Sequence, residues 1–524
     1  MTVEPVLIAG EWRAPRDPQG TLQNENPSTR QQLPQVFPVT GRLDVEDAIA
    51  AGKAAARELR NIPVGRIADF LDALADGMEE QSGPLVEMAH AETGLPAGPR
   101  LNSIELPRTT DQLRQAAAAA RDGSWRRATI DTGSNIRSML GPLDAPVVVF
   151  GPNNFPFAFN SVSGGDFAAA IAAGNPVIAK ANTGHPGTTR LIADIALQVL
   201  QDLDLPPAMV QLLYRTPRDV GAMLVSHPNI GATGFTGSKA AGLQLKVAAD
   251  QAGKPIYLEM SSVNPVFLLP GALRERGAEL AAEFYTSCAM GAGQFCTNPG
   301  LVILQDDETG REFIKEASRL FDEGAPQVLL GAGGPGDIAA SVATLTDAGA
   351  ELVTGGSQAE VPGYAFENTL LTVSGEEFLQ DPDVMQTEAF GTVSLLVLVD
   401  DQDQMAAIAD SMEGNLTGCI YSHGDGEDDE AYDTVAAELR PRVGRLLNDK
   451  MPTGVAVVSA MNHGGPFPAT GHPGFTAVGI PASLSRFAAL HCYDEVRPHR
   501  LPPELRDGNP TGMWRLVDGQ WTRD

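Results

Sequence analysis

Apolar residues recur along the chain at two different spacings, and each spacing predicts its own kind of element. Between residue 44 and about residue 81 the spacing is helical, with apolar side chains at Val45, Ala48, Ile49, Ile67, Phe70, Leu71 and Leu74. Asp44 stands where the N-cap of this helix is expected. Further helices are predicted at residues 85–93 and 103–121, and a short edge hairpin at residues 8–12.

From residue 146 onward, short apolar runs alternate with amphipathic stretches. The runs predict buried strands at residues 146–150, 176–180, 210–214, 230–235 and 255–258. The stretches between them predict helices at residues 163–173, 188–200, 219–226 and 239–251. This rhythm is typical of a parallel, doubly wound sheet whose strand ends form a crevice for a nucleotide.

The same rhythm continues in the second half of the chain. Strands are predicted at residues 263–269, 301–304, 394–399 and 418–421, and helices at residues 277–289, 309–320, 342–348 and 402–412. Residues 135–140 alternate like a strand, which we interpret as an exposed ribbon for subunit contact, and residues 500–524 as a terminal hairpin. The predicted fold class is α/β, with two doubly wound parallel-sheet domains and a small β ribbon.

Length and charge narrow the classes of function. A chain of 524 residues is too long for one core, so two or three domains are expected. The net charge of −29 disfavours binding to nucleic acid or to anionic membranes. No run of about 18 uncharged apolar residues predicts a membrane span, and the N-terminus lacks the features of a secretory signal.

The four cysteines point to a reducing compartment. They are too few for a disulfide framework, so the cytoplasm is the expected location. Cys288 and Cys296 lack Cys-x-x-Cys spacing and no His pair lies near them, so no metal site is predicted.

Cys296 lies in the stretch Gly-Ala-Gly-Gln-Phe-Cys-Thr-Asn-Pro-Gly at residues 291–300, directly before a predicted strand. Small residues on both sides leave room around the sulfur, and a loop at the edge of a rigid sheet is a typical place for a nucleophile. The alternative is a small buried side chain, which is what most free cysteines are.

Four polar positions fall at the ends of other predicted strands. Asn154 is either an amide donor for an oxyanion or simply a turn-forming residue beside proline. Lys180 either binds a ribose or phosphate in the crevice or is a solvent-exposed lysine at the end of a strand. Gly237 and Ser238 form an anion site at a helix N-terminus, or a cap without a ligand. Glu259 is a general base with a raised pKa, or a glutamate facing water.

Taken together, these stretches resemble the aldehyde dehydrogenase superfamily over nearly the whole chain. Each motif is weak alone, but their shared order is specific: Pro-Asn-Asn-Phe-Pro-Phe at 152–157, Lys180, Phe-Thr-Gly-Ser at 235–238, Leu-Glu-Met-Ser at 258–261, Gly-Gln-Phe-Cys-Thr at 293–297 and Glu-Ala-Phe-Gly-Thr-Val at 388–393. The resemblance implies a dinucleotide-binding domain (1–124 and 147–262), a catalytic domain (263–468) and an oligomerisation ribbon (125–146 and 490–524) that builds a homodimer or homotetramer.

The resemblance also implies roles for these residues. Cys296 is the expected nucleophile, Asn154 and the Cys296 backbone N–H form the oxyanion hole, and Glu259 activates the hydrolytic water. A thiohemiacetal and then a thioester on Cys296 carry the aldehyde to the acid. The expected cofactor contacts are Lys180 at the adenosine ribose, Gly237 and Ser238 at the pyrophosphate, Glu388 at the nicotinamide ribose and Phe390 near the nicotinamide.

The sequence departs from the family pattern in two places, and the second bears on the cofactor. Many members have Leu-Glu-Leu-Gly-Gly where this chain has Leu-Glu-Met-Ser-Ser at 258–262. Many also carry a glutamate where this chain has Thr183. A carboxylate there repels a 2′-phosphate, so a hydroxyl beside Lys180 favours NADP over NAD. Arg215 or Arg218 supplies a second cation in this interpretation.

The two strand-end motifs most resemble the subgroup that oxidises 2-oxoglutarate semialdehyde (2,5-dioxopentanoate) to 2-oxoglutarate. A related subgroup acts on long-chain fatty aldehydes, which need an apolar tunnel. Arg108 is the candidate clamp for a substrate carboxylate, although an exposed helix arginine is the commoner case. Phe157 and Phe295 line either kind of tunnel. An acylating enzyme that uses coenzyme A, and a non-catalytic binding protein on the same fold, remain alternatives.

Overall fold

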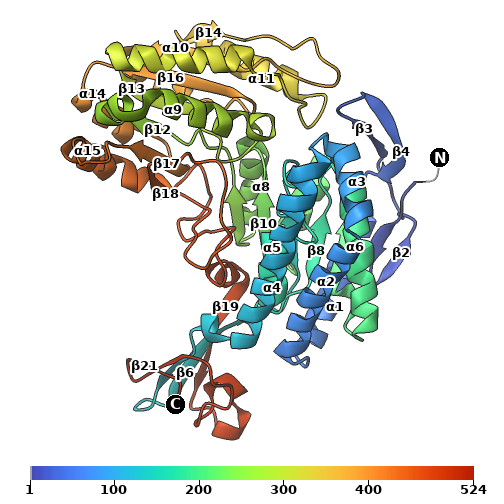
Figure 1. Ribbon diagram of the computed structural model, residues 1–524. Helices are drawn as coiled ribbons and strands as arrows, with labels where there is room; N and C mark the ends of the chain where they lie inside the picture. Colours follow the sequence, from blue (N-terminus) through green and yellow to red (C-terminus); the bar gives the residue numbers. More distant parts are fainter. Residues whose placement is uncertain (1–2) are drawn as a thin grey trace.

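Three larger sheets and a hairpin contain the strands of the chain, of which the computed structural model describes residues 3–524. Two of the sheets have seven strands each and lie in separate halves of the molecule, while a five-stranded ribbon extends away from both (Figure 1). The hairpin pairs β3 (Thr21–Asn26) with β4 (Gln31–Pro38). The α/β fold class predicted from the sequence is confirmed.

The first sheet has the order β11-β10-β7-β8-β9-β1-β2. Its parallel strands are β7 (Val147–Phe150), β8 (Val177–Lys180), β9 (Val210–Leu213), β10 (Ala232–Thr236) and β11 (Ile256–Glu259). The predicted edge hairpin is confirmed as β1 (Val6–Ile8) and β2 (Glu11–Arg13). Strand order reverses at β7, which pairs with both β8 and β10, and ligands of such sheets bind beyond the carboxyl ends of the strands at this point.

Helices cover both faces of this sheet: α5 (Gly165–Ala172), α6 (Pro186–Asp202), α7 (Arg218–Ser226) and α8 (Lys239–Gln251), with α1 (Arg42–Leu59), α2 (Val64–Glu80), α3 (Ser82–Thr93) and α4 (Leu106–Asp122) from the N-terminal part. The single helical stretch predicted from residue 44 is two helices, because Pro63 starts α2 as its N-cap. The N-cap prediction for Asp44 is wrong. Gly41 takes that place, and the buried Asp44 carboxylate pairs with Arg13 and accepts from the backbone N–H of Arg16.

The second sheet has the order β14-β15-β16-β13-β12-β17-β18. Its strands are β12 (Val266–Leu268), β13 (Leu301–Gln305), β14 (Glu351–Thr354), β15 (Thr369–Ser374), β16 (Val393–Val399), β17 (Asn415–Tyr421) and β18 (Val443–Asn448). Only β14 pairs antiparallel. The longer helices are α9 (Pro270–Ala289), α10 (Glu308–Glu323), α11 (Gly334–Asp347), α14 (Gln402–Ser411) and α15 (Asp429–Leu439), with the short α12 (Gly375–Gln380) and α13 (Pro382–Met385) before β16.

The ribbon joins distant parts of the sequence in the order β19-β6-β5-β20-β21. Its strands are β5 (Thr129–Asp131), β6 (Ile136–Pro142), β19 (Ala488–Asp494), β20 (Arg515–Val517) and β21 (Gln520–Thr522). The predicted terminal hairpin is confirmed by the antiparallel pair β20–β21. Large apolar side chains remain exposed on the ribbon, among them Leu490 (69%) and Trp521 (59%).

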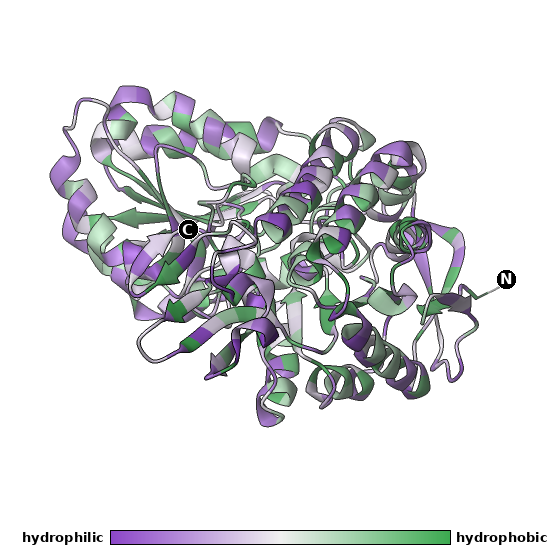
Figure 2. Ribbon diagram, turned by 90° about the horizontal axis from the view of Figure 1, so that it is seen from below, coloured by the Kyte–Doolittle hydropathy of each residue, from purple (hydrophilic) through white to green (hydrophobic). Residues whose placement is uncertain are grey.

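Hydrophobic residues concentrate in the strands, whereas the outer helices mix hydrophobic and hydrophilic positions (Figure 2). Every residue of β7 and β17 is buried, as expected for central parallel strands covered on both faces. Within residues 3–524 no helix combines the length and apolarity that crossing a bilayer requires.

Candidate active site

Cys296 lies on a tight loop between α9 and β13. Gly291, Ala292 and Gly293 all have positive φ angles, at 61°, 59° and 71°. A Cβ on Gly293 would lie 2.1 Å from the carbonyl carbon and oxygen of Gly391, so only glycine permits this close approach. The Cys296 loop is therefore docked against the segment that carries Glu388 and Phe390.

Two asparagines hold the other side of the Cys296 loop. Asn264 donates from Nδ2 to the carbonyl of Cys296 at 2.9 Å and to that of Asn298 at 2.9 Å. Asn415 Oδ1 accepts from the backbone N–H groups of Val263 and Asn264. Ser262, which replaces a glycine common in the family, has its hydroxyl 3.0 Å from Asn415 Oδ1 and accepts from the N–H of Leu416. Ser262 thus connects the segment between β11 and β12, which joins the two sheets, to β17.

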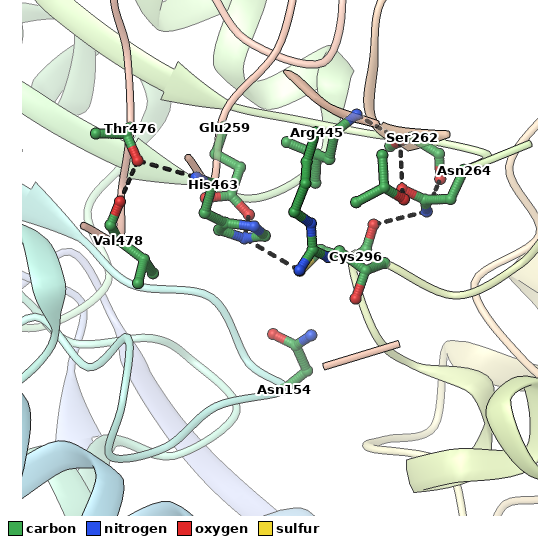
Figure 3. A network of polar contacts seen from close by, with 12 residues as sticks. Asn154, Glu259, Ser262, Asn264, Cys296, Arg445, His463, Thr476 and Val478 are labelled. Carbon is green, nitrogen blue, oxygen red and sulfur yellow. Dashed lines mark hydrogen bonds and ion pairs between the residues drawn. The ribbon is translucent and has the colours of Figure 1, made fainter. Parts of the chain in front are cut away.

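Glu259 and Cys296 are joined by a residue that was not predicted, His463. Its Nε2 lies 2.8 Å from Glu259 Oε1 and 3.5 Å from Cys296 Sγ. Figure 3 shows the imidazole between the other two side chains, with Arg445 beside them and Asn154 facing them. Glu259 and His463 are each 1% exposed. Glu259 and His463 are therefore buried behind Cys296, which itself is partly accessible to solvent.

His463 reaches this place on a long irregular segment, residues 449–481, that leaves the second sheet and pairs with the first. Thr470 forms a β-bridge with Glu259, and the N–H of Met260 donates to the carbonyl of Ala469. The backbone N–H of His463 donates to Thr476 Oγ1 at 2.9 Å. A sequence signal was present, because Gly464 and Gly465 follow His463 and a Cβ on either would collide with backbone oxygens.

Burial raises the pKa of the Cys296 thiol well above its ordinary value, and the carboxylates of Glu259 and Glu388 raise it further. The cationic Arg108 acts in the opposite direction. The free protein therefore holds Cys296 as a thiol at neutral pH. Activation of the nucleophile needs a base in contact with the sulfur, and His463 is placed to be that base.

The loop after β7 brings Asn154 to the Cys296 loop. Its Nδ2 donates to the carbonyl of Gln294 at 2.9 Å, and its own carbonyl accepts from Arg100 at 3.1 Å. Arg100 also pairs with the fully buried Glu105, which accepts from the N–H groups of Phe157 and Ala158. These contacts fix the Asn154 amide against the carbonyl of Gln294, two residues before Cys296, so that an amide donor lies beside the Cys296 loop.

An aromatic cluster (Phe155, Phe159 and Phe295) forms one wall beside the sulfur. The ring centroids of Phe155 and Phe295 are 5.1 Å apart, those of Phe155 and Phe159 5.3 Å, and Phe159 is 5.8 Å from the imidazole of His463. The prediction for Phe157 is corrected here. Its side chain is fully buried in the core of the first sheet, because its backbone N–H is held by Glu105, and Phe155 takes the place expected of it.

A cavity of about 230 Å³ lies between the carboxyl ends of the first sheet's strands and the segments that precede β12, β16 and β17. Its lining includes Ser261, Ser262 and Glu388. Burial raises the pKa of Glu388, which accepts from the N–H of Ser262 at 3.4 Å. The ion pair Lys239–Glu413 crosses the same region at 3.0 Å.

Most of the remaining predicted cofactor residues follow strands of the first sheet, and Phe390 comes from the second half of the chain. Gly237 donates its N–H to the carbonyl of Glu259, and the exposed Ser238 is the N-cap of α8, accepting from the N–H of Ala241. Thr183 and Arg215 are exposed beyond β8 and β9, as is Arg218 at the start of α7. Phe390 packs against the core of the first sheet from the opposite half of the chain.

Lys180 is an uncompensated cation. Burial, and then the positive charge of Arg215, lower the pKa of Lys180 to about 8. In the described part of the chain no carboxylate forms an ion pair with it. Two neighbouring cations without a counter-charge suit an anionic ligand.

Cys296, Glu259 and His463 also form a potential metal-ligand set, with their ligand atoms within 4.8 Å of one another. The sequence was read as lacking such a site, because His463 is far from Cys296 along the chain. All four cysteines are free.

Known proteins resemble this chain in both sequence and structure. A family model described as the aldehyde dehydrogenase family matches residues 12–466. The chain is 38% identical over 512 residues to an alpha-ketoglutaric semialdehyde dehydrogenase 2 of Azospirillum brasilense, and 35% identical over 515 residues to an alpha-ketoglutaric semialdehyde dehydrogenase of Acinetobacter baylyi. Each match covers 96% of this chain and 96% of the relative.

Solved structures share the fold at lower identity. Lactaldehyde dehydrogenase from Escherichia coli matches with a TM-score of 0.79 at 21% identity, covering 94% of this chain and 98% of that one. A Thermus 1-pyrroline-5-carboxylate dehydrogenase with bound NAD matches at 0.81 and 22%, covering 94% and 93%. An NADP complex of a Bacillus halodurans glyceraldehyde-3-phosphate dehydrogenase matches at 0.79 and 21%, covering 95% and 100%. The chain belongs to the aldehyde dehydrogenase family, and it is an oxidoreductase that acts on aldehydes.

Proposed function

We propose that this enzyme oxidises 2-oxoglutarate semialdehyde to 2-oxoglutarate, with Cys296 as nucleophile and NADP as hydride acceptor. The observation that carries the chemistry is the buried contact of Cys296 with His463 and of His463 with Glu259. The substrate rests on the two relatives that cover nearly the whole chain, both named for alpha-ketoglutaric semialdehyde.

Activation of Cys296 begins with a proton transfer. The thiol proton passes from Sγ to Nε2 of His463, and the resulting imidazolium is stabilised by the Glu259 carboxylate 2.8 Å away. The thiolate then attacks the aldehyde carbon. Asn154, together with the backbone N–H of Cys296, donates to the developing oxyanion, and loss of one such donor costs about 3 kcal/mol of transition-state stabilisation in other acyl-transfer enzymes.

A nicotinamide cofactor, when bound, would supply the hydride acceptor, and Cys296 would then hold the acyl group as a thioester. Glu259 then accepts a proton from water as the hydroxyl adds to the thioester. The departing sulfur takes back its proton from His463, and the carboxylic acid product ionises. The thiol proton therefore moves from Sγ to His463 and back, while Glu259 and the ionising acid each release one proton to solvent in every turnover.

The residues present fit a nicotinamide dinucleotide phosphate. Glu388 lines the cavity beside Cys296 and would hold the nicotinamide ribose, while Ser238 and the first N–H groups of α8 would hold the pyrophosphate. Lys180 and Arg215, which lack a nearby counter-charge, would bind the 2′-phosphate. Thr183 offers a hydroxyl where a carboxylate would repel that phosphate.

The test is steady-state oxidation of 2-oxoglutarate semialdehyde and decanal, followed by the absorbance of the reduced nicotinamide with NADP or NAD. We expect a higher kcat/KM for 2-oxoglutarate semialdehyde and for NADP. A clear preference for decanal would instead assign the enzyme to long-chain fatty aldehydes. Thioester transfer to added coenzyme A, faster than hydrolysis, would contradict the role of Glu259.

The exposed apolar residues of the ribbon support a further part of the proposal, a homo-oligomer. Leu490 and Trp521 lie on strands that extend away from both sheets, where a second copy of the chain can cover them. Light scattering on the purified protein distinguishes a dimer or tetramer from a monomer.

A further inference from the structure

Two arginines lie close to the active-site loop, and within residues 3–524 only one of them forms an ion pair. Arg100 is paired with Glu105 and donates to the carbonyl of Asn154. Arg108 lies eight residues further along, near the start of α4, and its side chain forms no hydrogen bond and no ion pair within residues 3–524. Its Nη1 is completely buried and still has no acceptor. A buried guanidinium nitrogen without a partner is costly for a fold to keep.

The surroundings of Arg108 place it at the substrate side of the nucleophile. Its guanidinium carbon is 5.3 Å from the ring centroid of Phe159 and 5.8 Å from that of Phe155. These rings belong to the aromatic cluster that continues to Phe295, the neighbour of Cys296. Burial lowers the pKa of Arg108, and the charges that act on it are, largest first, those of Glu105, Cys296, Arg100 and Glu259. Because Cys296 and Glu259 are among them, Arg108 lies within electrostatic reach of the Cys296 sulfur.

A third cation near the sulfur does not share this property. Both Nη atoms of Arg445 donate to backbone carbonyls, those of Pro452 and Gly454. Its side chain is therefore used to fix the 449–481 segment. Arg100 and Arg445 each keep a buried Nε without an acceptor, but their Nη atoms have partners. Of these three arginines, only Arg108 has no partner for either Nη atom within residues 3–524, and a guanidinium recognises a planar carboxylate through two parallel hydrogen bonds.

We propose that Arg108, held over the rings of Phe155 and Phe159, is a carboxylate-binding subsite that selects aldehydes carrying a second, anionic end. The inference rests on the proposed function and deepens it by assigning the residue that separates acidic from neutral aldehydes. Arg100 does not compete for the carboxylate, because Glu105 already neutralises it. The subsite therefore takes one negative charge, that of a monoanionic semialdehyde.

The experiment compares matched aldehydes with the whole enzyme: glutaric semialdehyde and pentanal, which differ in the terminal carboxylate. We expect the wild-type enzyme to prefer glutaric semialdehyde. In Arg108→Met the ratio of the two kcat/KM values should fall by about a hundredfold, because a buried charged hydrogen-bond donor is lost, with most of the change in KM for the acid. Arg108→Lys, which keeps the charge but not the planar fork, should fall between the two.

Arg114→Met is the matched control. Arg114 lies on the same helix α4 but is partly exposed and paired with Asp76 and Glu79, so the preference ratio should stay at the wild-type value. An unchanged ratio in Arg108→Met would overturn the proposal, as would a wild-type enzyme without preference for the acid. If Arg108→Met does not fold, Arg108→Lys is judged by the same ratio.

The results also show separately whether the Arg108 subsite or the proposed substrate is wrong. A wild-type enzyme that prefers glutaric semialdehyde to pentanal but does not oxidise 2-oxoglutarate semialdehyde would refute the proposed substrate and retain the subsite. An enzyme that oxidises 2-oxoglutarate semialdehyde with the same ratio in wild type and Arg108→Met would do the reverse.

Discussion

His463 and Glu259 divide the proton transfers of the proposed reaction between two side chains that touch. In the mechanism above, His463 serves the first half, formation of the thiolate, and Glu259 serves the second, attack of water on the thioester. A single rate constant does not separate these roles, but the first turnover does, because hydride transfer precedes hydrolysis.

We expect Glu259→Gln to keep a burst of reduced nicotinamide in the first turnover and to slow the steady state by about a hundredfold or more, since general-base catalysis contributes that much. His463→Gln should slow the burst itself. Rapid-mixing absorbance measures both. A full-sized burst in His463→Gln would contradict its assignment as the base for Cys296.

The same three side chains should bind a thiophilic metal ion. The S···N separation of 3.5 Å between Cys296 and His463 is close to that of ligands on a tetrahedral Zn²⁺. We expect low concentrations of Zn²⁺ to inhibit the enzyme reversibly, with recovery on adding a chelator. Mg²⁺ should have no such effect, because it prefers oxygen ligands. Zn²⁺ inhibition that persists undiminished in His463→Gln would show that the ion binds elsewhere.

At the scale of elements, the end of β8 should make cofactor binding depend on pH. Lys180 has a pKa of about 8, so it is charged below that pH and loses its charge as the pH rises through it. Attraction for a 2′-phosphate is then lost with rising pH. We expect the Kd of NADP to increase about tenfold from pH 7 to pH 9, following proton linkage at one site. The Kd of NAD should change less, and equal changes for both cofactors would exclude Lys180 from the phosphate site.

The strands of the first sheet were the most predictable elements. Their apolar runs are unbroken because both faces are covered by helices, so β7 to β11 were located within a few residues. Strands β14, β15 and β18 of the second sheet were missed. Most residues of β14 and β18 are only partly buried or exposed, which removes the apolar signal, whereas β15 is largely buried but has threonine or serine at three of its positions.

The candidate site was predicted where it depends on strand ends and missed where it depends on an irregular segment. Asn154, Glu259 and Cys296 each follow or precede an apolar run, and the structure brings them to one place. His463 has no such marker, because residues 449–481 are without periodicity and its contact with Cys296 spans 167 positions of the chain. Phe157 was chosen over Phe155 because spacing along a loop does not reveal which ring turns into the core.

At the scale of the whole molecule, the ribbon should govern assembly. Leu490 on β19 is 69% exposed, and the neighbouring β6 leaves Ile136 exposed as well. We expect Leu490→Asp to shift the protein to a smaller oligomer, since a charge is costly in an apolar interface. Light scattering measures the change. Val247→Asp, an exposed apolar position on α8 away from the ribbon, is the control and should leave the mass unaltered.

The return of residues 449–481 from the second sheet to β11 has a consequence for how such a protein can evolve or be rebuilt. His463, which contacts Cys296, follows the last strand of the second sheet in the chain, yet residues 469–471 of its segment are hydrogen-bonded to β11 of the first sheet and the residue after it. The two sheets therefore cannot be exchanged independently between related proteins. A chimera that grafts the second sheet of a relative onto this chain must inherit the segment with His463 from the same parent as β11, or its junction will fall inside the catalytic centre.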